Sequence, residues 1–169
     1  MTRFALIAAA ICGLLVVSPA FAHDFTVGSL KIAHPWTRAT PKGASVGGGY
    51  MKITNTGTAP DRLVGGASDV STHVEIHEMK MDNGVMKMRP VANGLEIKPG
   101  QTVEFMPGGY HVMFMGLKHQ LVQGQHLTAT LQFEKAGKVD VDFAVEGIGA
   151  QSPGPAGGDH AMPGMQMKH

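Results

Sequence analysis

Short runs of alternating hydrophobic and polar residues, separated by Gly, Pro and Asn, fill most of the chain between residues 25 and 146. Runs of about 4–8 residues that are bounded in this way are typical of strands in all-β sandwiches and barrels. No stretch shows the helical period together with the capping residues that predict a helix. The pattern therefore predicts an all-β domain, most simply a sandwich.

The runs place the expected strands and turns along the chain. We expect strands near residues 30–34, 50–54, 62–64, 74–81, 85–91, 94–97, 102–106, 110–115, 127–134 and 139–145. The first of these is expected to end at His34-Pro35. The glycines 47–49 lack the Lys and the following helix of a phosphate-binding loop, so we expect a bend where the next strand begins.

The dipeptide Asn83-Gly84 lies between two alternating runs and is the strongest local signal of a β-hairpin. A two-residue turn there fixes the register of both strands, because side chains alternate between the two faces of a strand. One face then carries the pairs Met81 with Met86, Met79 with Met88, and His77 with Pro90. The other face carries Lys80 with Lys87, and Glu78 with Arg89, the last being a favourable pair of opposite charges.

The first 22 residues read as a cleaved signal peptide. Arg3 precedes an apolar run over residues 4–17, and Ala20-Phe21-Ala22 is a typical cleavage site. The run is shorter than the roughly 20 residues that span a bilayer, so no stable membrane insertion is expected. Cys12 lies inside the run after a bulky residue, and we expect it to leave with the signal peptide. The protein is therefore predicted to be exported to the periplasm.

The rest of the chain divides into a β-sandwich domain at residues 23–146 and a flexible tail at residues 147–169. Once Arg3 is removed, basic and acidic residues balance, and no basic stripe predicts nucleic-acid binding. The tail begins with a Gly/Pro-rich linker that cannot build a core. Its end is rich in His and Met, and a second metal site is predicted there at His160, Met162, Met165, Met167 and His169.

The most informative pattern is H-x10-M-x22-H-x-M, formed by His77, Met88, His111 and Met113. In the hairpin register, His77 and Met88 are diagonal neighbours, and His111 and Met113 share one face of their strand. The processed chain contains no cysteine, and Met makes up 12 of the 169 residues. Thioether sulfur with imidazole nitrogen favours copper, above all Cu(I). We expect these four side chains to form a metal site if the two segments meet.

Other residues of the same types have ordinary structural interpretations. Methionine often fills gaps in cores, and we expect this role for Met51, Met86, Met106 and Met115. The histidines expected to be surface or hydrogen-bonded residues are His34, His73, His119 and His126. Trp36 and Tyr110 are candidates for shielding the rim of the site, although Trp36 is more simply interpreted as a core anchor.

Several segments together resemble the periplasmic copper chaperone family, the PCuAC domain. These segments are His34-Pro-Trp-Thr-Arg-Ala-Thr-Pro, Gly47-Gly-Gly-Tyr-Met, Val74-Glu-Ile-His-Glu-Met, Gly84-Val-Met-Lys-Met-Arg-Pro and Pro107-Gly-Gly-Tyr-His-Val-Met-Phe-Met. The resemblance covers residues 25–146 and implies a cupredoxin-like Greek-key β-sandwich. It also implies Cu(I) binding at His77, Met88, His111 and Met113, and delivery of copper to cytochrome c oxidase subunit II or to another copper chaperone.

The expected function is therefore that of a copper metallochaperone, a monomer and not an enzyme. The tail is expected to capture a further copper ion, with its histidines suited to Cu(II). Two alternatives stay open: a copper oxidoreductase that uses the N-terminal His23, and a copper storage or tolerance protein. An electron-transfer blue-copper protein is excluded, because that centre needs a Cys thiolate.

Overall fold

The computed structural model describes residues 24–154, and these residues form eleven β-strands without a helix. The strands are β1 (Phe25–Val27), β2 (Leu30–Arg38), β3 (Val46–Asn55), β4 (Asp61–Ser68), β5 (His73–Asp82), β6 (Val85–Pro90), β7 (Leu95–Ile97), β8 (Thr102–Phe105), β9 (Tyr110–Met115), β10 (His126–Phe133) and β11 (Lys138–Glu146). The all-β prediction is confirmed for this part of the chain. No helix within it is long and apolar enough to cross a membrane.

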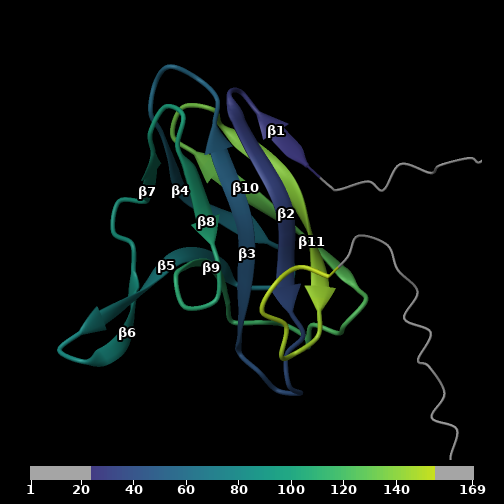
Figure 1. The fold of residues 1–169 in the computed structure, drawn as a ribbon. Coiled ribbons are helices and arrows are strands. Elements are labelled where there is room, and N and C mark those ends of the chain that lie inside the picture. Colours follow the sequence, from purple (N-terminus) through teal and green to yellow (C-terminus); the bar gives the residue numbers. More distant parts are fainter. Residues whose placement is uncertain (1–23, 155–169) are drawn as a thin grey trace, which may run out of the picture.

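The strands join in one continuous sheet that folds over to give two packed layers (Figure 1). Their order is β6-β5-β9-β8-β3-β2-β11-β10-β4-β7, with β1 added beside β2. Two further pairings join β9 to β3 and β4 to β5, and the second of these brings the two ends of the order together. Within the order itself, β5 and β9, which lie far apart in the sequence, are direct neighbours.

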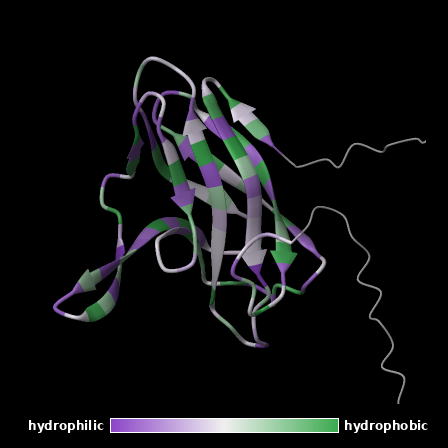
Figure 2. Ribbon diagram, viewed as in Figure 1, coloured by the Kyte–Doolittle hydropathy of each residue, from purple (hydrophilic) through white to green (hydrophobic). Residues whose placement is uncertain are grey.

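The core lies between the two layers and is built from alternate residues of the strands. Figure 2 shows the alternation of hydrophobic and hydrophilic positions along the central strands. Phe114 of β9 and Phe143 of β11 meet edge to face, with ring centroids 5.7 Å apart. Leu30, Ile53 and Phe133 are fully buried in the same cluster. Strand β9 is therefore fixed by its core-facing side, which leaves its other side available for a site.

Strand β2 does not end at His34-Pro35 as expected but continues to Arg38. Its pairing with β3 shifts register between Ala33 and Trp36, and His34 has a φ angle of 51°. Proline cannot donate a hydrogen bond to the neighbouring strand, so within a sheet it is tolerated at a bulge. The prediction of a strand end was wrong because the bulge accommodates Pro35 within the strand.

The glycines 47–49 lie inside β3, so the predicted bend was also wrong. A Cβ atom at Gly49 would lie 3.0 Å from the Phe114 ring and 3.1 Å from the Phe143 ring. Glycine therefore lets these two rings pack directly against the backbone of β3. The glycine run reflects close packing, which a sequence pattern does not distinguish from a turn.

The β5–β6 hairpin has the predicted register, with Met79 opposite Met88 and His77 opposite Pro90. Asn83 and Gly84 both have positive φ angles, 50° and 78°, as a type I′ turn requires. The hairpin projects from the body of the sandwich (Figure 1).

The charges on the other face of the hairpin differ from the expectation. Asp82 accepts from Lys87 at 2.9 Å and from Arg89 at 2.6 Å. The structure therefore pairs Arg89 with Asp82, in place of the expected Glu78. Since Asp82 also pairs with Lys87, it relieves the repulsion between two basic side chains.

The first residues of the predicted tail are held against the domain. Arg38 donates from Nε to the carbonyl oxygen of Ala150 at 2.6 Å, and the Gly154 amide donates to Glu146 at 2.9 Å. The predicted signal peptide and the five His and Met residues of the predicted tail site lie outside the described residues.

Candidate metal site

Two histidines face each other across the pairing of β5 with β9. His77 and His111 are directly opposite in register, and their ring centroids are 5.9 Å apart. Their strand neighbours Ile76 and Val112 point into the core, so alternation places both imidazoles on the opposite face of the sheet. Both histidines are nevertheless buried. The fold therefore joins the two segments that the sequence alone could not connect.

Each of these imidazoles has one ring nitrogen held by the protein. Nε2 of His77 lies 2.7 Å from a carboxylate oxygen of Glu75, and Nδ1 of His111 lies 3.0 Å from the carbonyl oxygen of Gly109. Both oxygens can only accept, so these two nitrogens donate. The other nitrogens, Nδ1 of His77 and Nε2 of His111, are buried and have no hydrogen-bond partner in the part of the chain that is described.

The surroundings of His111 favour the neutral form of its imidazole. Burial lowers the pKa of His111, and the nearby His77 lowers it further. The pKa of the Glu75 carboxyl is lowered as well, chiefly because this carboxylate accepts the hydrogen bond from His77. A neutral imidazole with a free lone pair is the form that binds metals.

Two methionines lie on the same face of the sheet as the histidines. Met113 follows His111 by two positions on β9, lies opposite Glu75 and is buried. Met88 belongs to β6 and lies opposite Met79, one diagonal step from His77 and half exposed. The structure thus brings His77, His111 and Met113 together on two paired strands. Met88 stands beside them on the projecting hairpin.

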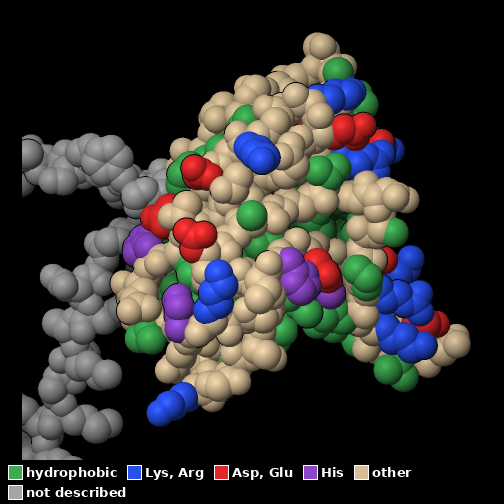
Figure 3. Space-filling model, turned by 180° about the vertical axis from the view of Figure 1, so that it is seen from behind, with side chains coloured by type: hydrophobic (Ala, Val, Ile, Leu, Met, Phe, Trp, Pro, Cys, Tyr) green, Lys and Arg blue, Asp and Glu red, His purple; other side chains and the backbone are tan. Residues whose placement is uncertain are grey.

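The solvent-facing side of this region can be followed in the space-filling view. Figure 3 shows histidines beside acidic side chains near the base of the hairpin, which itself carries basic and hydrophobic side chains. Within residues 24–154, no three side chains of His, Cys, Asp or Glu converge on a point where they could hold a metal ion. The sulfur donors on the same face as the two histidines are the thioethers of Met88 and Met113.

Tyr50 covers the side of the site toward β3, and the sequence analysis did not identify it. Gly48 of β3 pairs with Met113, and a Cβ atom at Gly48 would lie 2.9 Å from the Tyr50 hydroxyl. The Tyr50 ring therefore reaches over Gly48 toward the methionine. Burial raises the pKa of Tyr50. Trp36 packs on this ring with centroids 4.6 Å apart; it is buried, as expected of an anchor, but it lies on the Tyr50 side of the sheet and outside the main core cluster.

Other expectations for single residues have mixed outcomes. Tyr110 lies opposite Glu78, on the face of β9 away from His111, and packs near Phe105, so it does not shield the site. Met51 is buried as predicted. The prediction that Met86 and Met106 fill the core was wrong, because both are exposed.

Glu75 is a contact of the site that the sequence analysis missed. It also reaches His73, at 3.3 Å. The signal was available, because residues two apart on a strand share a face, and Glu75 precedes His77 by two.

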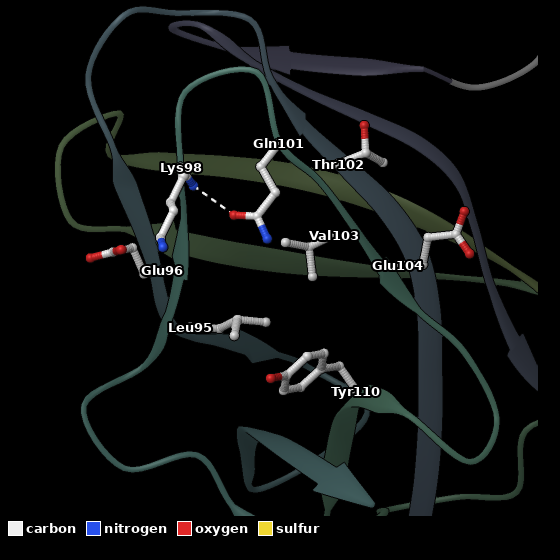
Figure 4. A pocket seen from close by; sticks show the side chains of 8 residues that line it. All are labelled: Leu95, Glu96, Lys98, Gln101, Thr102, Val103, Glu104 and Tyr110. Carbon is white, nitrogen blue, oxygen red and sulfur yellow. Dashed lines mark hydrogen bonds between the residues drawn. The ribbon is translucent and has the colours of Figure 1, made fainter.

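A separate pocket of about 390 Å³ lies along β7 and β8 (Figure 4). It is lined by polar and charged side chains that include Glu96, Lys98, Gln101 and Glu104. The Lys98 amide donates to the Gln101 side chain at 2.9 Å across its rim. Neither an imidazole nor a thioether lines the pocket, so its chemistry differs from that of the paired histidines.

Comparison with known proteins gives a family match and several solved relatives. Residues 30–145 match the family described as "Putative lipoprotein LpqE-like". A protein of Leifsonia xyli subsp. xyli (strain CTCB07), named "Putative lipoprotein Lxx21020", is 34% identical over 117 residues, which are 69% of this chain and 69% of that protein.

Two of the solved structures with similar folds carry copper. A copper-bound PCuAC domain from PmoF2 is 34% identical with a TM-score of 0.63, covering 74% of this chain and 98% of that domain. The Cu(I) form of DR1885 from Deinococcus radiodurans is 28% identical with a TM-score of 0.52, covering 74% of this chain and 81% of that one. These neighbours confirm the predicted cupredoxin-like sandwich.

Proposed function

Because the chain belongs to the LpqE-like family, and because its structure pairs two histidines beside two methionines, we propose that it is an exported copper carrier. The observation that carries this proposal is the pair of buried, unpartnered nitrogens, Nδ1 of His77 and Nε2 of His111. A buried polar atom without a partner is costly, so a ligand that binds both nitrogens removes that cost. The similarity to copper-bound domains supports copper as that ligand.

We assign Cu(I) to His77, Met88, His111 and Met113. Thioether and neutral imidazole groups together suit Cu(I) better than harder cations. Three of the four side chains are buried, and Met88 is half exposed. A partly open shell of this kind suits a carrier, because an incoming ligand can replace the exposed sulfur first. Binding and release then involve exchange of ligands without any catalysed reaction, so the protein is not proposed to be an enzyme.

We further propose that the predicted signal peptide directs the carrier to the periplasm and that the recipient is the copper centre of cytochrome c oxidase subunit II or another copper chaperone. Thiolates of a recipient bind copper more strongly than neutral ligands, which makes transfer favourable. The residues His160, Met162, Met165, Met167 and His169 are proposed to bind a further copper ion, including Cu(II). Deletion of residues 159–169 should lower the copper stoichiometry, and unchanged stoichiometry in both oxidation states would contradict this second site.

X-ray absorption of the Cu(I)-loaded protein tests the main site directly. We expect a first shell of nitrogen and sulfur that loses nitrogen in His77→Ala/His111→Ala and loses sulfur in Met113→Ala. His119→Ala is the matched control, because His119 is exposed and lies outside the paired strands. An all-nitrogen shell, or equal Cu(I) affinity in the double variant, would refute the assignment. Tight binding without transfer to a thiolate recipient would favour copper storage over delivery.

A further inference from the structure

One face of the β5–β6 hairpin consists of four methionine side chains, of which Met79 is partly buried and the other three are open to solvent. Met79 lies opposite Met88, and Met81 lies opposite Met86, so four thioethers occupy two adjacent cross-strand rows. Met81, Met86 and Met88 are 60%, 45% and 50% exposed. Figure 2 shows hydrophobic positions alternating with hydrophilic ones along this projecting arm.

Packing does not explain this face. Methionine is used in cores because its flexible chain fills irregular gaps, but here there is no gap to fill. Among the described strands, β6 pairs only with β5, so the hairpin gains little from apolar side chains that remain in water. Branched residues would stabilise an exposed strand pair better. The property that methionine has, and that Leu, Ile and Val lack, is its sulfur atom.

The spacing allows several of these sulfurs to bind one ion. Side chains directly opposite in an antiparallel pair have Cβ atoms about 4.5–5.5 Å apart, and diagonal neighbours are about 7–8 Å apart. Metal–sulfur bonds of about 2.3 Å and the three rotatable bonds of methionine span these separations. We propose that Met79, Met81 and Met86 form a second, outer Cu(I) site made of thioethers alone. Thioethers are soft and neutral ligands, which favours Cu(I) over harder cations.

The charged side chains of the hairpin leave the methionine face open to an incoming ion. The basic side chains of the hairpin point to its other face, where Lys87 and Arg89 pair with Asp82. These basic side chains therefore lie away from the methionine side chains that would bind the ion. Because the outer site is exposed, Cu(I) remains partly solvated there, and its binding does not require a charge to be buried.

The outer site also lies in line with the inner site, so copper can move from one to the other. This step rests on the proposed function of the inner site. Met81, Met79 and His77 lie on the same face of β5. Each is two residues from the next, which corresponds to about 7 Å along a strand. Met88 lies opposite Met79 and diagonal to His77, so it neighbours both sites. Cu(I) captured at the tip can move toward the histidines by exchange, one metal–sulfur bond breaking as the next metal–ligand bond forms. The ion stays Cu(I) throughout, and no electron donor is needed.

Methyl NMR of the mature full-length protein, labelled with ¹³C at the methionine methyl groups, tests the outer site residue by residue. Cu(I) is diamagnetic, so each methyl signal stays visible during an anaerobic titration. We expect the Met88 and Met113 methyls to shift first, and the Met79, Met81 and Met86 methyls to shift as more Cu(I) is added. Unchanged Met81 and Met86 signals at excess Cu(I) would overturn the outer site. Shifts at these two residues without any at Met88 or Met113 would support the outer site while contradicting the inner one.

The variant Met81→Leu/Met86→Leu removes sulfur but keeps the size and hydrophobicity of both side chains. It should bind one Cu(I) fewer than the unmodified protein, keep the affinity of the inner site, and load that site more slowly from a weak Cu(I) donor. Val85→Leu is the matched control, since Val85 is exposed on the other face of the same hairpin and carries no sulfur. Unchanged stoichiometry in the double variant would overturn the binding site, and an unchanged loading rate would overturn its role in acquisition.

Discussion

Replacing Glu75 by Ala should weaken Cu(I) binding by about tenfold. Glu75 accepts from Nε2 of His77 at 2.7 Å and so leaves Nδ1 of that ring, which is buried and has no hydrogen-bond partner among the described residues, as the nitrogen with the free lone pair. Removing the hydrogen-bond partner of a metal-binding histidine typically costs about 10–100-fold in affinity. The Glu75 side chain is 40% exposed, so water screens the contact and the lower end of this range applies. A tenfold loss corresponds to about 1.4 kcal/mol.

The affinity can be measured by anaerobic competition with a chelator that changes colour when it binds Cu(I). Glu75→Gln keeps an oxygen acceptor in the same place and should recover most of the lost affinity. In the metal-free protein, ¹⁵N NMR should show His77 protonated at Nε2. In Glu75→Ala, the same spectrum should show a mixture of the two tautomers, because the acceptor that selects one of them is gone.

Glu78→Ala is the matched control, because Glu78 is also on β5 but faces the other side of the sheet. His73→Ala removes the second contact of Glu75, at 3.3 Å, and should leave the affinity nearly unchanged. The reasoning is refuted if Glu75→Ala binds Cu(I) as tightly as the unmodified protein and retains a single His77 tautomer.

Three further outcomes follow from the core and from the buried histidine. Phe114→Ala removes a fully buried ring that packs on Phe143, and chemical denaturation should show a loss of about 3–5 kcal/mol in the free energy of unfolding. Gly49→Ala places a methyl group 3.0 Å from the Phe114 ring, and the same measurement should show a loss of about 1–3 kcal/mol; unchanged stability would contradict this close contact. The lowered pKa of His111 means that the unfolded chain binds more protons as the pH falls below its ordinary value of 6.5, so metal-free stability should decrease there, and His111→Gln should weaken this pH dependence.

Local chemistry made the hairpin predictable from the sequence. Asn83-Gly84 favours one turn type, and the two-residue alternation of strands then fixes which side chains share a face. The face that carries Met79, His77 and Met88 follows from these two facts without knowledge of the rest of the molecule. The choice of ligand types was equally local, because it depends on the softness of sulfur and nitrogen and on the absence of cysteine after Cys12.

Contacts between distant segments could not be predicted in this way. The sequence did not reveal that β9 lies beside β5, with His77 opposite His111, because strand order depends on how the whole sheet folds to bury its core. Local patterns also failed at Pro35, where a bulge keeps β2 continuous, and at Gly49, where close packing of rings resembles a turn signal. Burial was equally undetermined for Met86, since alternation assigns a side chain to a face but does not say what covers that face.

The sequence by itself determined an all-β chain, the register of one hairpin and a set of soft metal ligands, because each depends on neighbours within a few residues. Only the tertiary structure decided that two histidines meet, which of their nitrogens lack partners, that Glu75 contacts His77, and that Tyr50 reaches over Gly48, which pairs with Met113. These features arise where strands remote in the sequence are pressed together around one core. Their positions are set by packing of the whole domain, which no local pattern records.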